Sequence, residues 1–165
     1  MVILFTDMEG STPLTERLGD DGAQQVLRAH NARIRECLAR RSGAEIKHTG
    51  DGIMASFPSA ASAIDCAIDI QRAFARDSEV DVDRLVRVRV GLNAGEPVAE
   101  EGDLFGTAVQ AAARIAGRAR PGQILVSDVV RQLAAGKGFA FIDNGRVALK
   151  GLSERFRLYS VDWTS

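Results

Sequence analysis

Two aspartates at the ends of strand-like runs constrain the possible fold of this chain more than any other feature of its sequence. The first run, residues 2–5, is continuous and apolar, which is typical of a central strand covered on both faces, and Asp7 is expected in the loop that follows it. Asp51 lies in a Thr-Gly-Asp-Gly sequence between strand-like runs at 44–48 and 53–57. An Asp-Gly pair in this position predicts a hairpin with the aspartate at its tip. Because consecutive elements tend to be neighbours, both acids are expected near one edge of a sheet.

The rest of the chain predicts helices and further strands in alternation. Ser11 and Thr12, followed by proline, indicate a helix start, and apolar residues recur at helical spacing in later segments. The predicted helices are 24–38, 59–74 and 108–119, the predicted strands are 86–93 (half-buried), 123–127, 139–142, 147–149 and 156–161, and residues 76–84 and 100–103 are predicted to be connections. Hairpins interrupt the alternation, so the chain is assigned to the α+β class, with residues 1–165 forming a single domain.

The overall composition argues against several classes of protein. The 21 basic and 22 acidic residues leave a net charge of -1, so there is no basic surplus to bind a nucleic acid. No apolar run approaches the roughly 20 residues of a membrane span, and the N-terminus carries no targeting signal, so we expect a cytoplasmic protein without a membrane segment. Cys37 and Cys66 lack metal-ligand spacing and are predicted to be reduced core thiols, while His30 is predicted on a helix surface.

The paired aspartates and a few cationic residues are the candidates for chemistry. Asp7 and Asp51 would repel each other unless cations joined them, and Mg²⁺ prefers a few carboxylates together with substrate phosphates. Alternatively, both could be ordinary turn carboxylates. Arg114 lies on a helix of small apolar residues, where a buried guanidinium would need an anion, whereas Lys47 alone could be a solvated edge residue. The sequence contains no dinucleotide fingerprint, Walker-type loop, nucleophile elbow or HExxH pair.

Six short segments in a fixed order resemble one known family. They are Phe-Thr-Asp-Met-Glu-Gly-Ser-Thr (5–12), Lys-His-Thr-Gly-Asp-Gly (47–52), Val-Gly-Leu-Asn-Ala-Gly-Glu (90–96), Asp-Leu-Phe-Gly-Thr-Ala-Val-Gln-Ala-Ala-Ala-Arg (103–114), Pro-Gly-Gln-Ile-Leu-Val-Ser (121–127) and Leu-Lys-Gly (149–151). Together they resemble the class III nucleotidyl cyclase catalytic domain, and most of all the bacterial, mycobacterial-type adenylyl cyclases. The resemblance implies a ferredoxin-like βαββαβ core with an additional C-terminal helix and strands.

The same resemblance implies a role for each candidate residue. Asp7, Asp51 and the Met8 carbonyl would hold two divalent cations, Mg²⁺ or Mn²⁺, and the segment made of Met8, Glu9, Gly10, Ser11 and Thr12 would cradle the triphosphate. Lys47 and Asp103 would select the base. Adenine offers an acceptor at N1 and a donor amine at N6, which these two side chains complement, whereas guanine presents the opposite polarity at both atoms. The family's transition-state arginine, phosphate-binding lysine and ribose-orienting amide correspond to Arg114, Lys150 and Gln110.

Gln110 is a departure from the family, which usually has asparagine at this position. The extra methylene displaces the carboxamide by about 1 Å, and a displacement of this size can cost about 10²-fold in rate.

The expected reaction is the conversion of ATP to 3′,5′-cyclic AMP and pyrophosphate by a head-to-tail homodimer that shares each site between two chains. The alternatives are a guanylyl cyclase, or a weakly active or silent cyclase-like module that binds nucleotide or only dimerises.

Overall fold

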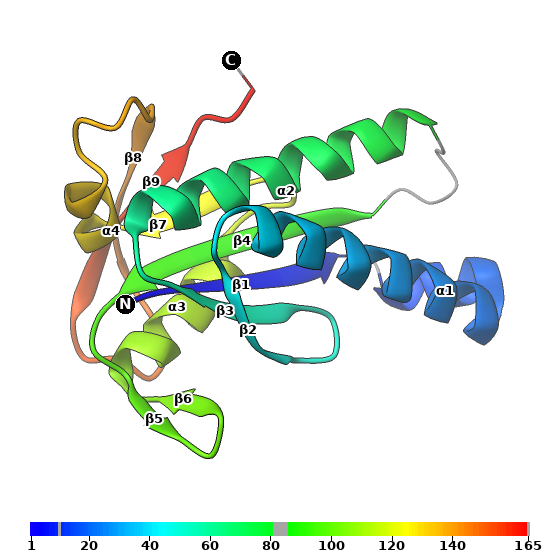
Figure 1. Ribbon diagram of the computed structural model, residues 1–165, viewed down its shortest axis with the longest axis horizontal. Helices are drawn as coiled ribbons and strands as arrows, with labels where there is room; N and C mark the ends of the chain where they lie inside the picture. Colours follow the sequence, from blue (N-terminus) through cyan, green and yellow to red (C-terminus); the bar gives the residue numbers. More distant parts are fainter. Residues whose placement is uncertain (10, 81–85, 165) are drawn as a thin grey trace.

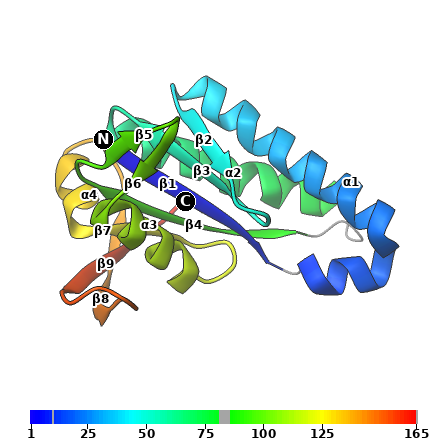
Figure 2. The same ribbon diagram turned by 90° about the horizontal axis from the view of Figure 1, so that it is seen from below.

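The computed structural model describes residues 1–9, 11–80 and 86–164. Its elements in chain order are β1 Val2–Glu9, α1 Ser11–Arg40, β2 Ala44–His48, β3 Ile53–Phe57, α2 Ala60–Val80, β4 Arg87–Ala94, β5 Val98–Glu100, β6 Asp103–Phe105, α3 Thr107–Arg118, β7 Ile124–Ser127, α4 Asp128–Leu133, β8 Phe141–Ala148 and β9 Arg155–Val161. Within these residues, seven strands form one sheet in the order β2-β3-β1-β4-β7-β9-β8, and β5 pairs only with β6. Helices α1 and α2 cover one face of the sheet and α3 covers the other (Figure 1; Figure 2).

The first six elements form the ferredoxin-like core that the resemblance implied. Their chain order is β1-α1-β2-β3-α2-β4, and their strands lie in the order β2-β3-β1-β4. The additional C-terminal helix is α3, predicted as residues 108–119, and a further helix, α4, follows where the sequence pattern predicted no element. Strand β9 joins β8 to β7 as an antiparallel neighbour of both. None of the helices in the described part of the chain is long and apolar enough to cross a membrane.

Strand β1 is buried on both faces, as its continuous apolar run predicted. Val2 and Leu4 belong to the core beneath α1 and α2, whereas Ile3 belongs to the core beneath α3. Because successive side chains of a strand alternate between faces, Asp7 lies on the α3 face. The prediction that Asp7 lies in a loop is wrong. β4 pairs with β1 along its whole length, with Asp7 opposite Arg89, so this aspartate is inside the strand.

The β2–β3 hairpin is confirmed, with Asp51 in its connecting turn. The Thr49 amide donates to the Gly52 carbonyl over 2.8 Å and closes this turn. Gly52 lies so close to β1 that a Cβ there would be 1.8 Å from the Thr6 carbonyl oxygen, so only glycine fits. The Met8 amide donates to the Asp51 carbonyl over 2.7 Å. These contacts hold the tip of the hairpin against the end of β1.

Strand β4 is covered on both faces over most of its length, with only Arg87 at its start exposed, which corrects the prediction of a half-buried strand. Val88 and Val90 lie in the core beneath α1 and α2. On the other face, Gly91 lies against α3, where a Cβ would come within 2.2 Å of the Ala116 backbone nitrogen. The alternating pattern was misleading because Gly91 and Asn93 face the closely packed helix α3 and not solvent.

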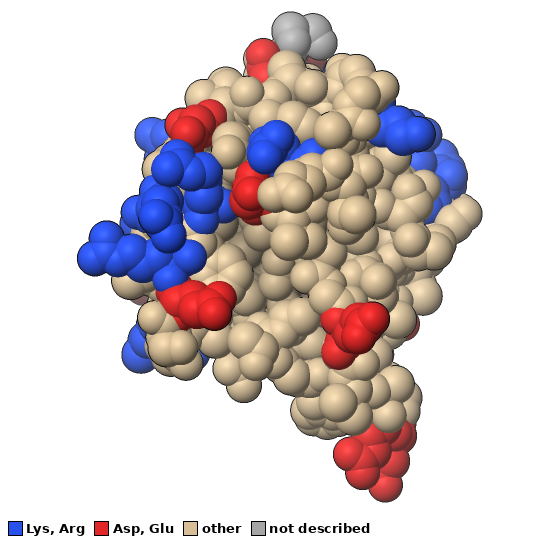
Figure 3. Space-filling model, turned by 90° about the vertical axis from the view of Figure 1, so that its left-hand side faces the viewer, with Lys and Arg blue, Asp and Glu red and all other residues tan. Residues whose placement is uncertain are grey.

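Two predicted connections contain regular structure. Helix α2 extends to Val80, so residues 76–80 are helical, while residues 81–84 lie outside the described residues. The predicted loop at 100–103 is the turn of the β5–β6 hairpin, where Glu101 and Gly102 have φ angles of 51° and 77°, typical of a two-residue hairpin turn. This hairpin projects from the body of the molecule and carries acidic side chains at its end (Figure 3).

Two other boundaries differ from the sequence pattern. Residues 139–142 and 147–149 were predicted as separate strands, but β8 is continuous from Phe141 to Ala148, with an irregularity between Asp143 and Arg146 that interrupts its pairing with β9. Helix α1 extends from Ser11 through the predicted 24–38 segment to Arg40, with a break in helical backbone at Gly19.

His30 is buried in the core, which contradicts its predicted place on a helix surface. Only 2% of the residue is exposed, its ring packs 5.1 Å from that of Phe74, and its Nε2 atom has no hydrogen-bond partner among the described residues. Burial is the main cause of a lowered pKa for His30. The predictions for Cys37 and Cys66 are confirmed, since both are buried free thiols.

A pH-dependent stability follows from the burial of His30. Because its pKa in the folded chain lies below the ordinary value of 6.5, the unfolded chain binds the proton more readily, and stability falls as the pH drops through and below about 6.5. His30→Gln should therefore flatten the loss of stability between about pH 6.5 and 5. Urea unfolding midpoints across this range measure the effect. The exposed His48, replaced in the same way, is the control, and an unchanged pH profile in His30→Gln would contradict the prediction.

Candidate active site

The structure brings the backbones of the two candidate metal aspartates together at the end of β1. Asp51 is held there by the hydrogen bond from Met8, which directly follows Asp7. The Asp7 side chain is 34% exposed and accepts a hydrogen bond from Nη2 of Arg89 on the neighbouring strand β4. The carboxylate of Asp7 is thus neutralised by a cation within its own chain.

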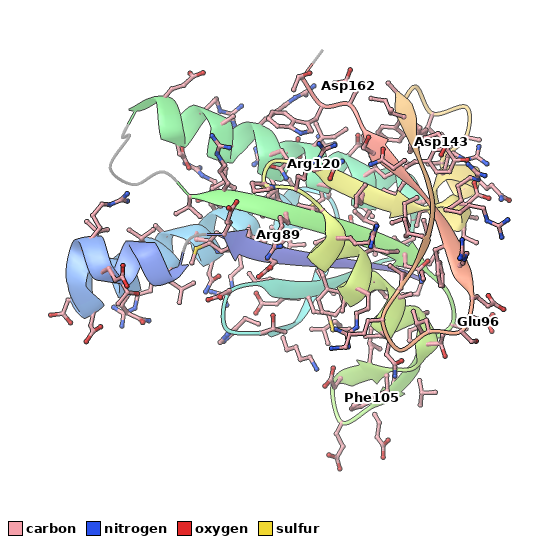
Figure 4. All side chains as sticks on the ribbon, turned by 180° about the vertical axis from the view of Figure 1, so that it is seen from behind. Arg89, Glu96, Phe105, Arg120, Asp143 and Asp162 are labelled. Atoms are coloured by element: carbon pink, nitrogen blue, oxygen red, sulfur yellow. The ribbon has the colours of Figure 1, made fainter. Side chains whose placement is uncertain are left out.

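Arg89 is a functional candidate that the sequence analysis missed. Its Nη1 atom donates to the Gly117 carbonyl of α3 over 3.5 Å, and its buried Nε atom has no partner among the described residues. Figure 4 shows Arg89 on β4, beside the end of α3. Arginine alternating with valine in a strand suggested a solvent-facing side chain. Only the antiparallel register, which sets Arg89 opposite Asp7, reveals the pairing.

The residues at this end of β1 suit a hard divalent cation bound together with phosphate. Carboxylate and carbonyl oxygens are the ligands that Mg²⁺ takes, and it commonly uses one or two carboxylates plus substrate phosphates. Within the described residues, no group of three or more histidine, cysteine, aspartate or glutamate side chains could hold an ion without such help.

The segment expected to cradle the triphosphate is partly strand and partly helix. Met8 and Glu9 are the last residues of β1, and the Met8 side chain is buried against Val26 of α1. Gly10 lies outside the described residues, as do the side chains of Ser11 and Thr12, whose backbone forms the first turn of α1. A helix therefore begins here with its N-terminal amides, which favour an anion.

Lys47 and Asp103 form an ion pair, with Nζ of the lysine 2.8 Å from Oδ2 of the aspartate. The Leu104 amide donates to the other carboxylate oxygen over 2.7 Å. The Lys47 ammonium, followed by this amide, holds the pKa of Asp103 below its usual value. The two side chains that the resemblance assigns to base selection therefore meet, although they are far apart in the sequence.

An irregularity in β2 directs Lys47 to this position. The register shifts between Glu45 and Lys47, so the two side chains do not share a face as strict alternation would require. Glu45 instead pairs with Arg35 of α1 over 2.7 Å, while Lys47 reaches the β5–β6 hairpin. Lys47 is thus not a merely solvated edge residue.

Gln110 and Arg114 both lie on the exposed face of α3, one turn apart. The neighbouring residues Ala111, Ala112 and Ile115 are buried against the sheet. Since residues four apart share a helix face, the two polar side chains point away from the core together. The prediction that the Arg114 guanidinium is buried is therefore wrong.

Arg114 and the exposed Lys150 line the same pocket, which has a volume of about 310 Å³. Lys150 follows β8. Its neighbour Leu149 is only 3% exposed and lies in the core formed with α3. The packing of Leu149 brings the lysine to the helix. Two of the residues that the resemblance connects with phosphate are therefore adjacent, and neither has a carboxylate partner in an ion pair between described residues.

Comparison with known proteins identifies the class to which this fold and this arrangement belong. Residues 1–162 match the family described as the adenylate and guanylate cyclase catalytic domain. The chain therefore belongs to the class III adenylate and guanylate cyclase catalytic domain family.

Individual relatives agree with this assignment. The chain is 35% identical to an adenylate cyclase of Mycosarcoma maydis, covering 81% of this chain and 6% of that protein. It is 31% identical to a pH-sensitive adenylate cyclase of Mycobacterium tuberculosis, covering 98% of this chain and 40% of that protein. The crystal structure of an adenylate/guanylate cyclase/hydrolase from Silicibacter pomeroyi matches with a TM-score of 0.87 and 34% identity, over 97% of this chain and 94% of that one. The chain thus spans less than half the length of these two curated relatives.

Proposed function

We propose that this chain is an adenylyl cyclase that converts ATP to 3′,5′-cyclic AMP and pyrophosphate. The main support is the ion pair between Lys47 and Asp103. These side chains present a donor and an acceptor side by side, which complements N1 and the N6 amine of adenine. In guanine both polarities are reversed, so GTP would set a donor against Lys47 and an acceptor against Asp103, which is costly.

The residues at the end of β1 would bind the metal ions and the triphosphate. Asp7, Asp51 and the Met8 carbonyl would hold two Mg²⁺ or Mn²⁺ ions, which when bound supply activation of the ribose 3′-hydroxyl and neutralise phosphate charge. Arg89 would exchange its contact with Asp7 for a phosphate oxygen, which would also satisfy its unpartnered Nε. The amides at the start of α1 would donate to the same phosphates.

The exposed face of α3 would stabilise the charge that develops during the reaction. Arg114 would contact the α-phosphate, Lys150 would contact the phosphate chain, and Gln110 would orient the ribose. These preorganised donors lower the barrier because they need no rearrangement when negative charge builds up on the phosphate oxygens.

The orientation of these groups favours a homodimer with shared sites. Arg114 and Gln110 point outward from α3, whereas Asp7 lies on β1, on the face of the sheet that α3 covers. A second copy of the chain placed head to tail would bring its own metal aspartates to this exposed face. In such a dimer, Lys47 and Asp51 of one chain would serve different sites.

Product analysis tests the proposed activity directly. Purified protein at high concentration is incubated with Mn²⁺ and either ATP or GTP, and the products are identified by mass spectrometry. Cyclic AMP as the main product is expected. An excess of cyclic GMP over cyclic AMP would establish the guanylyl cyclase alternative. If neither cyclic nucleotide formed, the chain would be a silent module.

Changing the base-selecting pair should change the preferred substrate. Lys47→Glu combined with Asp103→Ser should lower the ratio of kcat/KM for ATP over GTP by about tenfold or more, because each well-placed contact with a base edge is worth about 1–3 kcal/mol. Initial rates with both nucleotides measure the ratio. Glu100→Gln, opposite Asp103 in the same hairpin, is the matched control and should leave it unchanged. An unaltered ratio in the double variant would refute the role of this pair.

A further inference from the structure

The pocket beside α3 is lined by more cations than the resemblance accounts for. Its walls are formed by Ala113, Arg114, Gly117, Arg118, Ala148, Leu149 and Lys150, around a volume of about 310 Å³. The third cation is Arg118, to which no role has been assigned so far. None of these lining residues is acidic, and the others are small or apolar. At Gly117 a Cβ would meet no atom within 4 Å, so the wall between the two arginines is open.

Packing fixes the backbone positions from which all three cations line the pocket. Arg114 and Arg118 are four residues apart on α3, on the face opposite its buried alanines. Lys150 is brought to them by the buried side chain of Leu149, and the chain then turns sharply, with the Leu152 amide donating to the Leu149 carbonyl over 3.1 Å and Gly151 at a φ of 82°. The cluster is therefore a consequence of the core and not of chance side-chain positions.

The charge of this cluster is not balanced within the described part of the chain. Arginines elsewhere on the surface pair with carboxylates, for example Arg33 with Asp77 and Arg41 with Asp69. Arg114, Arg118 and Lys150 form no such ion pair between described residues. Like charges four apart on a helix repel each other. A cation in the last turn of a helix interacts favourably with the helix dipole, which could explain Arg118 by itself. The dipole does not explain why Lys150 lines the same pocket. Three converging cations suit a polyanion.

We propose that Arg118 binds the β- and γ-phosphates of the substrate and the pyrophosphate formed from them. This inference rests on the proposed function, in which Arg114 contacts the α-phosphate. Arg118 lies four residues, about 6 Å, further along α3, which is where a phosphate chain running along the helix would continue.

The proposed chemistry explains why a cation is useful at this place. The 3′-oxygen forms a bond to the α-phosphorus and releases its proton to solvent, while the bond from that phosphorus to the bridging oxygen breaks. The pyrophosphate leaves with the bridging oxygen and the electron pair, so its negative charge increases during the reaction. Arg118 would stabilise this charge and then retain the product until it dissociates.

Binding of inorganic pyrophosphate tests the inference apart from cyclase activity. Calorimetric titration in the presence of a chelator, which removes any contribution of metal at Asp7 and Asp51, compares Arg118→Ala with the parent chain. Pyrophosphate affinity should fall roughly fivefold to tenfold, the size of a lost charge-assisted contact at a partly exposed site, and Arg118→Lys should retain much of it. Arg120→Ala is the matched control, because Arg120 lies on the turn after α3 and lines a different cavity with Pro121 and Ile142 (Figure 4).

Kinetics and thermal unfolding separate anion binding from a structural role. In an active enzyme, Arg118→Ala should raise the KM for ATP and weaken product inhibition by pyrophosphate by a similar factor. A lowered unfolding temperature with unchanged pyrophosphate affinity would mean that Arg118 only supports the helix end, and would overturn the inference. If no cyclic nucleotide forms but pyrophosphate binding still depends on Arg118, the anion site stands and the proposed cyclase function fails.

Discussion

Replacing Asp51 with asparagine should reduce turnover of ATP by roughly 10³-fold or more. Asparagine keeps the shape of the side chain and the hairpin turn, but it removes the negative charge that would hold a divalent cation beside the phosphates. The loss of metal stabilisation of the transition state is worth several kcal/mol, which corresponds to this factor.

Both activity and metal binding measure the effect of Asp51→Asn. Binding of Mn²⁺ in the presence of an unreactive ATP analogue, followed by electron paramagnetic resonance, should be lost or weakened together with turnover. Asp65→Asn, on the surface of α2 with its carboxylate 3.9 Å from Arg41, is a matched control that should affect neither. Parent-like Mn²⁺ binding and turnover in Asp51→Asn would remove the basis of the proposed metal site.

Arg114→Ala should lower kcat by about 10² to 10³, the usual consequence of deleting one preorganised group that stabilises transition-state charge. The fold should be preserved, because this side chain is exposed and packs against nothing in the core. The substitution should change the KM for ATP less than kcat, since the contact would strengthen as charge develops on the α-phosphate.

Mixing two inactive variants tests whether the site is shared between chains. In a head-to-tail dimer of one Asp51→Asn chain and one Arg114→Ala chain, one of the two sites contains an intact aspartate and an intact arginine. An equimolar mixture that exchanges freely forms mixed dimers for about half of its molecules, so about one quarter of the parent activity should return. Each variant alone at the same total concentration is the control. No recovery in a mixture shown to exchange subunits would mean that each chain carries its own complete site.

Local patterns in the sequence predicted most of the helices and strands. The β2–β3 hairpin followed from an Asp-Gly pair between two strand-like runs, and α2 and α3 followed from helical periodicity, because turn geometry and amphipathic spacing depend on neighbouring residues. The family resemblance also implied that Lys47 and Asp103 act together in base selection. The structure shows these two side chains in an ion pair.

Other features depended on how distant segments pack together. Asp7 lies inside a strand because β4 pairs along the whole of β1, and the same register brings Arg89 to it. His30 is buried because α1 packs against α2 at that position, which the polar residues around it in the sequence concealed.

What the sequence alone determined was local structure: the presence of most strands and helices, the Asp-Gly turn of the β2–β3 hairpin, and the order of the motifs. The tertiary structure alone decided the surroundings of each charge, including the outward orientation of Arg114, the pairing of Arg89 with Asp7 and the convergence of Arg118 with Lys150. The physical reason is that helix and turn formation depend on interactions within a few residues, whereas the exposure and partners of a side chain are set by strand register and helix packing between segments far apart in the chain.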